Sequence, residues 1–299
     1  MRKTGFSLLL IIGAAGANAA EGGASVYPMG VETVMQGALP GPHETIVGFF
    51  NDFYQANQLM GPDGKSAVPG FHLRVEGAAV KILHNWGLKV LGGTLVSTVG
   101  VPVLYEHLSA PFGAGGKTGL GNVDVEVASV AYHHGNWHWW YGADVFMPGA
   151  SYQKGALLNV GQHYFAEGAQ GAFTWLPSQG KEEFSSKFQY IFNNTDGATN
   201  YHSGNEFIWE YTGMRNVTKN LSIGAVGYFY KQTTDDLQNG VTFGDGNRGR
   251  DLSVGPQVRY HLGHMLLVAK YYRDTLVQNR PCGNSFWLQV GIPLHVEEN

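Results

Sequence analysis

The feature that most constrains this chain is a two-residue alternation of apolar and polar side chains, which recurs from about residue 44 to the end. In one segment Val123, Val125 and Val127 alternate with Asp124 and Glu126. Because successive side chains of a β-strand point to opposite faces, this period indicates strands with one apolar and one polar face. Twelve segments show it, at 44–56, 71–83, 89–105, 121–134, 137–148, 163–176, 182–193, 206–216, 221–233, 249–262, 264–274 and 284–294. The sequence therefore predicts an all-β protein.

The lengths of the segments and of their connections indicate a transmembrane barrel. Most segments reach the roughly 9–11 residues that a tilted strand needs to cross a bilayer. The connections alternate between short and long. The short ones lie at 84–88, 135–136, 177–180, 217–220 and 263, and the long ones at 57–70, 106–120, 149–162, 194–205, 234–248 and 275–283. Short periplasmic turns and long outer loops are typical of outer-membrane barrels, so we predict an up-and-down antiparallel β-barrel of about 12 strands.

Composition supports a lipid-facing barrel. Charged residues make up 14% of the chain, against about 25% in soluble domains. Five of the seven tryptophans lie beside the predicted short turns, namely Trp86, Trp137, Trp139, Trp140 and Trp175. Tryptophan prefers the membrane interface because its ring is apolar while its N–H stays hydrated. A soluble β-protein that buries these aromatics in a core is the alternative. Lys81 falls on the apolar face of its segment, where we expect it near a membrane edge.

The N-terminus indicates export. Arg2 and Lys3 precede an apolar run, and Ala17-Asn18-Ala19 fits the small-x-small cleavage pattern. The expected organisation is a signal peptide at 1–19, an N-terminal segment at 20–43 and an outer-membrane barrel at 44–299. We therefore expect the protein in the bacterial outer membrane, in contact with lipid. A net charge of -4 without a basic block argues against nucleic acid as a partner.

Several short motifs, taken in order, resemble a known family. They lie at 89–93 with Pro102, at 119–123, at 136–139 followed by 144–152, at 198–207 and at 255–258. The sequence resembles the meta-pathway phenol-degradation (SphA-like) family of outer-membrane β-barrel proteins over most of the chain after residue 21. Asn122 and Asn205 stand where aspartate is expected. The resemblance implies an outer-membrane barrel associated with the catabolism of aromatic or other hydrophobic compounds.

Charged side chains on the polar faces are candidates for the barrel lumen. The predicted lumen-lining residues are Arg74, Glu76, Asp124, Glu126, Asp144, Lys187, Glu206, Glu210, Asp251, Arg259 and Lys270. They either pair with one another and fill the barrel, or form a polar pathway that selects solutes. In the segment at 71–76, this assignment turns Phe71, Leu73 and Val75 toward lipid.

Segment 20–43 is either a periplasmic tail or a lumen plug. Glycine and proline break regular structure, while Val26, Tyr27, Met29, Val31, Val34 and Met35 lie between them. Exposed apolar groups gain nothing in water, which favours burial. Ordering the backbone costs about 1–2 kcal/mol per residue. Each buried side chain returns about 1.5–3 kcal/mol. The balance is near zero without hydrogen bonds to the lumen, so we expect a loosely held plug.

Two motifs suggest other chemistry. The histidines of 133–138 could share a metal ion, but a turn divides them and no carboxylate or thiolate lies within the cluster. His202 and Ser203 are adjacent, whereas a hydrolase needs its serine and histidine in contact on one face. Cys282 is the only cysteine, which excludes an internal disulfide. We expect no metal, no other cofactor and no enzymatic activity.

The leading interpretation is a monomeric channel for the passive uptake of small hydrophobic or aromatic compounds. The outer loops would offer the first contacts to the solute, at Phe112, Tyr152, Tyr201 and Phe243. One alternative is a structural or interaction barrel with a closed lumen. The other is an outer-membrane hydrolase.

Overall fold

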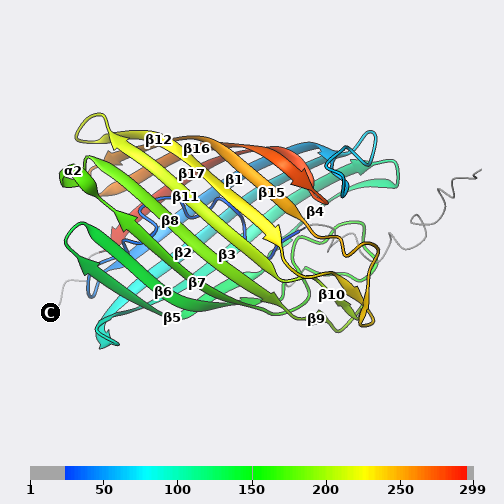
Figure 1. The fold of residues 1–299 in the computed structure, drawn as a ribbon, viewed down its shortest axis with the longest axis horizontal. Helices are drawn as coiled ribbons and strands as arrows, with labels where there is room; N and C mark the ends of the chain where they lie inside the picture. The colour runs from blue at the N-terminus through cyan, green and yellow to red at the C-terminus, as the bar shows by residue number, and fades with distance from the viewer. Residues whose placement is uncertain (1–23, 150, 295–299) are drawn as a thin grey trace, which may run out of the picture.

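The computed structural model describes residues 24–149 and 151–294, which form a closed antiparallel β-barrel (Figure 1). The predicted signal peptide lies outside these residues. Twelve strands build the barrel wall, as the alternation predicts. They are β1 (Thr45–Leu59), β2 (His72–Val90), β3 (Gly93–Ala110), β5 (Val123–His134), β6 (Trp137–Met147), β7 (Ala166–Trp175), β8 (Glu182–Asn193), β11 (Glu206–Asn216), β12 (Leu221–Gln232), β15 (Arg250–Leu262), β16 (Met265–Gln278) and β17 (Pro281–Leu294).

Hydrogen bonding between neighbouring strands closes the barrel without a free edge around the wall. The order runs β2-β1-β17-β16-β15-β12-β11-β8-β7-β6-β5-β3, and β3 pairs again with β2. The first strand is held on both sides, since Thr45 lies opposite Leu294 of β17 and His84 of β2. Strands that cross a membrane must pair on both sides, because each backbone N–H or C=O group left unpaired in hydrocarbon costs several kcal/mol.

One part of the wall departs from this simple pattern. The β3 strand pairs with β5 through residues 94–100 and with a further strand, β4 (Gly113–Leu120), through residues 103–110. Consequently β4 and β5 follow one another along the same edge of β3, with Gly121 and Asn122 between them. The loop that follows β6 packs against β4. Its Ser151 hydroxyl accepts a hydrogen bond from the backbone N–H of Leu120 (3.0 Å).

Three predicted connections are wrong. Residues 84–88 are part of β2, and the chain turns instead at Leu91 and Gly92, whose φ angles are +49° and +85°. A two-residue turn with positive φ at both positions matches strand twist, and glycine adopts it without strain. The expected long loop at 106–120 is mostly the β3–β4 hairpin. The one at 275–283 shrinks to residues 279–280, between β16 and β17.

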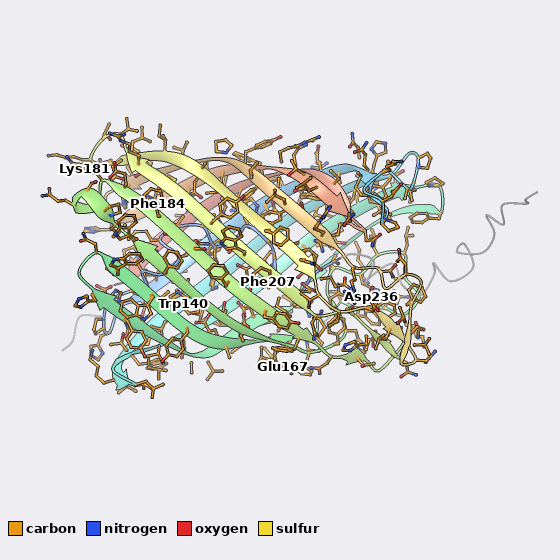
Figure 2. The ribbon with its side chains drawn as sticks, in the orientation of Figure 1. Trp140, Glu167, Lys181, Phe184, Phe207 and Asp236 are labelled. Atoms are coloured by element: carbon orange, nitrogen blue, oxygen red, sulfur yellow. The ribbon has the colours of Figure 1, made fainter. Side chains whose placement is uncertain are left out.

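The alternation of faces follows the prediction closely on β8. Phe184, Phe188 and Phe192 are exposed on the outer surface, whereas Glu183 and Lys187 are buried inside. Figure 2 places Phe184 near the end of the barrel that carries the short turns.

Four of the five interface tryptophans are exposed near the short turns, as expected: Trp86, Trp137, Trp139 and Trp175. The prediction is wrong for Trp140, which is only 5% exposed. A tryptophan next to Trp139 on a strand must point to the opposite face, here the lumen.

The two ends of the barrel differ. One end carries the short turns, including the single turn α2 (Pro177–Gly180) between β7 and β8. The other carries longer loops, in which β14 (Val241–Thr242), β13 (Leu237–Gln238), β10 (Tyr201–His202) and β9 (Thr195–Asp196) form a small sheet (Figure 1). Among the described residues, no helix is long and apolar enough to cross a membrane.

Candidate functional site

Residues 24–43, which we call the N-terminal segment, lie inside the barrel. Val26, Tyr27 and Val31 are buried in one cluster with wall residues such as Phe146 and Ile191. The segment contains no helix or strand. Its backbone groups therefore need partners from the wall, because unpaired buried N–H and C=O groups are costly. The polar lumen faces of the strands supply those partners.

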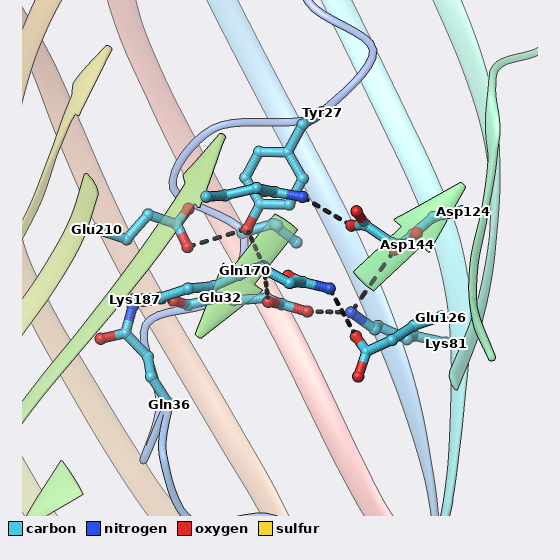
Figure 3. A network of polar contacts seen from close by, with 12 residues as sticks. Tyr27, Glu32, Gln36, Lys81, Asp124, Glu126, Asp144, Gln170, Lys187 and Glu210 are labelled. Carbon is cyan, nitrogen blue, oxygen red and sulfur yellow. Dashed lines mark hydrogen bonds and ion pairs between the residues drawn. The ribbon is translucent and has the colours of Figure 1, made fainter. Parts of the chain in front are cut away.

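An ion-pair cluster holds the middle of the N-terminal segment. The Glu32 carboxylate pairs with the ammonium groups of Lys81 on β2 and Lys187 on β8, which face each other across the lumen (Figure 3). The Lys81 ammonium also lies 3.9 Å from the Asp124 carboxylate. Buried charges are tolerated only when they are paired. Among the described residues, Glu32 therefore supplies the one carboxylate that pairs with both lysines at once.

Three more wall residues, Glu210, Lys270 and Gln257, also hold the N-terminal segment. Glu210 on β11 accepts hydrogen bonds from the Tyr27 hydroxyl (2.9 Å) and the Gly30 N–H (2.5 Å). Lys270 on β16 donates to the Val31 carbonyl oxygen (2.9 Å). It also donates to the Thr33 hydroxyl (2.9 Å), which itself donates to Gln257 on β15 (2.7 Å). With β2 and β8, which carry Lys81 and Lys187, five different strands thus bind this irregular segment.

The rest of the segment is fixed at the end with the short turns. The Trp140 indole N–H donates to the Gln36 carbonyl oxygen (2.6 Å), and the Asn85 amide donates to that of Pro40 (2.7 Å). Gly37 lies directly against β7, where an added Cβ would come within 2.3 Å of the backbone of Phe173. No other residue type fits at this position.

These contacts change how firmly we expect the N-terminal segment to be held in the lumen. The near-zero balance from the sequence counted no hydrogen bonds to the lumen. Each intramolecular hydrogen bond contributes about 0.5–1.5 kcal/mol, and more when one partner is charged. The N-terminal segment makes many such bonds, several of them to charged groups, so we now expect it to be held firmly.

A cavity of about 580 Å³ lies beside the start of the N-terminal segment, toward the loop end of the barrel; we call it the outer cavity. Val26, Pro28 and Met29 of the segment form part of its lining. On the side of β2 and β3 its wall is apolar except for Glu106, and it is lined there by Phe71, Leu73, Val75, Pro102, Leu104 and Leu108. This volume lies within the roughly 300–1,000 Å³ of small-molecule sites.

The structure buries most of the predicted lumen charges inside the barrel. Eight of them are buried: Glu126, Asp144, Lys187, Glu206, Glu210, Asp251, Arg259 and Lys270. Arg259 pairs with Glu183 across the lumen (2.5 Å), and Glu126 accepts a hydrogen bond from the Gln170 amide (2.8 Å). Some of these side chains thus pair with one another, which is one of the two roles considered from the sequence. Others bind the N-terminal segment, a role not considered there. A polar pathway for solutes stays a prediction.

The structure corrects the prediction for Arg74 and Glu76. Arg74 is exposed and pairs with Glu76, whereas Leu73 and Val75 on the opposite face of β2 line the outer cavity. The faces of this strand are therefore reversed relative to the prediction. The physical reason is that the lumen here is apolar, so the apolar face points inward. Lys81 has the same parity as Leu73 and lies inside, not at a membrane edge.

Two of the four predicted solute contacts lie at the outer cavity. Phe112 and Phe243 line it. The Tyr201 ring packs against Phe243 with 5.6 Å between centroids, and so supports the lining. Tyr152 instead stacks on His163 at 4.5 Å, and it is not among the lining residues.

Sequence reasoning missed several residues that the structure brings together. Glu32 was not singled out within the N-terminal segment, and Asp52, Arg280 and Trp287 were not assigned to the lumen. All three of the latter line the outer cavity. The signal available in the sequence was Lys81, a charge on an otherwise apolar strand face, which requires a buried partner.

In the described residues, the side chains considered for a metal site and for a hydrolase are not arranged for either function. The Nδ1 atoms of His133 and His138 lie 2.6 Å apart on the exposed β5–β6 hairpin. No group of three or more His, Cys, Asp or Glu suited to a metal occurs within residues 24–149 and 151–294. His202 contacts the Thr195 hydroxyl (3.4 Å) rather than Ser203.

Comparison with known proteins agrees with this architecture. Residues 56–290 match the family model described as "Putative MetA-pathway of phenol degradation". Among solved structures, the COG4313 outer membrane channel from Pseudomonas putida F1 is similar, with a TM-score of 0.76 at 15% identity, over 90% of this chain and 100% of that one. The KdgM porin gives a TM-score of 0.48 at 9% identity, over 84% and 99%. The NanC porin gives 0.44 at 10% identity, over 84% and 100%. No curated protein matches the sequence significantly.

Proposed function

The chain belongs to the family described as "Putative MetA-pathway of phenol degradation", and from this premise we propose that it is a passive channel for small hydrophobic or aromatic compounds. It is an outer-membrane β-barrel protein surrounded by lipid. A solved structure with a similar fold is itself described as an outer membrane channel.

The observation that carries the proposal is the outer cavity. It lies inside a closed barrel and is lined by aromatic and aliphatic side chains from both the wall and the loops, including Leu104, Phe112 and Phe243. A wall of this kind favours apolar solutes because burying apolar surface is worth about 25 cal/mol per Å². Against Leu73, Val75 and Leu104, a sugar would lose hydrogen bonds to water that these side chains cannot replace.

The proposed mechanism is passive and has two stages. A solute first passes between the outer loops and enters the cavity, where Phe112 and Phe243 meet it. Further movement toward the short-turn end requires the N-terminal segment to shift, because Val26, Pro28 and Met29 form part of the cavity wall. No covalent step or energy input is part of this mechanism.

Uptake by intact cells tests the proposal. Cells that carry the protein should take up radiolabelled 2-naphthylmethanol faster than cells that lack it, and sucrose no faster. Leu104→Trp fills the cavity and should reduce the gain, whereas Val103→Trp places the same ring on the exposed outer face of β3 and should preserve it. Both variants must first be shown to assemble, by their heat-dependent migration on gels.

The competing functions give different results in the same experiment. A structural barrel with a closed lumen would give no uptake gain, with either the native protein or the variants. A hydrolase would convert an ester substrate, and the conversion would disappear on changing Ser203 or His202. Uptake that is equal with and without the protein would overturn the channel proposal.

A further inference from the structure

The outer, lipid-facing surface of the barrel turns from apolar to polar near the end that carries the longer loops. On four strands an aromatic side chain of this surface is followed, two positions nearer those loops, by a polar one. Residues two positions apart share a face of the strand. The aromatic residues are Phe53, Phe229, Tyr271 and Phe286, and the polar ones are Gln55, Lys231, Arg273 and Asn284. This change marks the level at which lipid acyl chains give way to head groups.

Three cations lie near this level on adjacent strands. They are Lys231 on β12, Arg250 on β15 and Arg273 on β16, and we call them the outer basic patch. Lys231 and Arg273 are exposed, and Arg250 is half-buried. Arg250 belongs to the outer face because the next residue, Asp251, is buried inside the barrel. The patch thus presents three positive charges to the lipid head groups.

The outer basic patch has no ion-pair partner within residues 24–149 and 151–294. Asp235, which follows β12 in the chain, pairs with Arg248 instead (2.6 Å). Lys231 and Arg250 lie directly opposite each other in the strand register, and like charges at such positions destabilise a sheet. An anion from outside the chain would remove this repulsion.

Neutral amides extend the patch along the wall. Asn284 on β17 lies opposite Arg273 and accepts a hydrogen bond from its guanidinium (3.0 Å). Gln55 on β1 lies opposite Asn284 and is exposed. Arg74 on β2 comes next in the row, but Glu76 already pairs with it. Cations beside amides suit a ligand that carries both phosphate and hydroxyl groups.

The wall at β7 and β11 is different at its loop end. On β7 the outward side chain there is Glu167, which accepts a hydrogen bond from the Asn194 amide (3.0 Å). On β11 the corresponding residue is Phe207, and Figure 2 labels both side chains. The cations therefore do not form a uniform belt around the barrel. They gather on the side formed by β12, β15 and β16.

The position of the patch selects among anions. Long loops of such barrels face the outside of the cell, which puts the patch at the outer leaflet of the membrane. In outer membranes the lipid of that leaflet is a glycolipid with phosphate groups on its sugars, whereas glycerophospholipids fill the inner leaflet. Arginine binds phosphate through paired hydrogen bonds, and clustered cations beside a membrane bind anionic lipids.

From these observations we infer that the outer basic patch is a binding site for the phosphorylated sugar head group of an outer-leaflet glycolipid. The phosphate lies among the three cations, and sugar hydroxyl groups bond to the amides of Gln55 and Asn284. The acyl chains continue onto the apolar surface below, past Phe229 and Tyr271. The site lies outside the barrel, so the inference does not depend on the proposed channel function.

Binding of lipid A tests the inference directly. The purified full-length protein in neutral detergent is mixed with bis-phosphorylated lipid A or with the same lipid after removal of its phosphates. Native mass spectrometry over a series of lipid concentrations counts the bound molecules. We expect the phosphorylated form to bind at least about tenfold more tightly, a factor that corresponds to about 1.4 kcal/mol.

Variants locate the site. Lys231→Gln combined with Arg250→Gln removes the two opposed cations and should weaken lipid A binding at least about tenfold, and Arg273→Gln should weaken it several-fold. Lys181→Gln removes an exposed cation at the short-turn end and is the control, with unchanged affinity expected (Figure 2). Without lipid, the double variant should unfold at the native temperature or above, because its opposed charges are gone.

Each other outcome contradicts the inference in its own way. Equal binding of the two forms of lipid A would show that phosphate plays no part. Displacement of lipid A by inorganic phosphate at the same concentration would indicate a site for free phosphate, and equally tight binding of phosphatidylglycerol would indicate a response to negative charge alone. Native affinity in the assembled double variant would place the site elsewhere. If the double variant does not assemble, Arg273→Gln and the dephosphorylated lipid decide the matter.

Discussion

Glu32 on the N-terminal segment forms an ion pair with Lys187 on β8, although 155 positions separate the two residues in the chain. The same carboxylate also pairs with Lys81. A single acidic side chain thus links a segment without regular structure to two strands of the wall. Through this contact, the position of the N-terminal segment and the charge of the lumen depend on each other.

Removing that charge should loosen the middle of the N-terminal segment. Glu32→Gln leaves Lys81 and Lys187 without their main partner, and breaking a buried ion pair in this way typically costs about 3–5 kcal/mol. We expect higher ion conductance in planar bilayers and a shift toward anions. Glu167→Gln makes the same change at an exposed position and should have neither effect. Unchanged conductance and selectivity in Glu32→Gln would mean that the pair does not hold the segment.

The reversed faces of β2 predict opposite behaviour at two neighbouring positions. Lys81 is buried in the lumen, whereas Val80 is 39% exposed on the outer face. Val80→Lys places a cation in lipid near the middle of the strand and should destabilise the barrel by about 2–4 kcal/mol. Denaturant titration of the folded protein in lipid measures this, with Val80→Leu as the control. A Val80→Lys barrel as stable as the native one would restore the original assignment of faces.

The stability of the small sheet formed by β9, β10, β13 and β14 should depend on pH through Asp236. Its carboxylate accepts hydrogen bonds from the Tyr201 hydroxyl (2.5 Å) and the Gly204 N–H (2.8 Å). Burial raises the pKa of Asp236 above its ordinary value, and these hydrogen bonds offset only part of that rise. A raised pKa in the folded state means that the stabilisation is complete below the ordinary carboxyl pKa and is lost as pH rises through the raised value.

Hydrogen exchange of the Gly204 amide, corrected for the intrinsic pH dependence of exchange, measures whether the sheet loses stability as pH rises. Protection should be greater in acid than at neutral pH. Asp236→Asn resembles the protonated carboxyl and should remove the pH dependence, while Asp245→Asn, in the same loop, should leave it in place. Protection that increases with pH in the native protein would contradict the predicted direction.

The number of strands and their general pattern could be predicted from the sequence because lipid and closure impose them. Phe184, Phe188 and Phe192 show why: one face of β8 meets hydrocarbon along its length. The rule fails at Leu73 and Val75, where an apolar cavity makes the inner face resemble the outer one. The partners of Glu32 could not be predicted, since they come from strands far apart in the chain and depend on the path of an irregular segment.

Deleting residues 24–40 tests whether the N-terminal segment closes the lumen. The barrel should still assemble, because every wall strand begins after the deletion and Thr45 keeps its partners Leu294 and His84. The deletion removes Glu32 and also the backbone groups that Lys270 and Asn85 bind, so these side chains turn to water. Water and ions should then fill the short-turn half of the lumen, and conductance should rise well above that of Glu32→Gln, which removes one contact only. Heat-dependent migration on gels confirms assembly before conductance is compared. A correctly assembled deletion with native conductance would show that the lumen is closed by wall side chains alone, and that the many hydrogen bonds to the segment serve stability rather than closure.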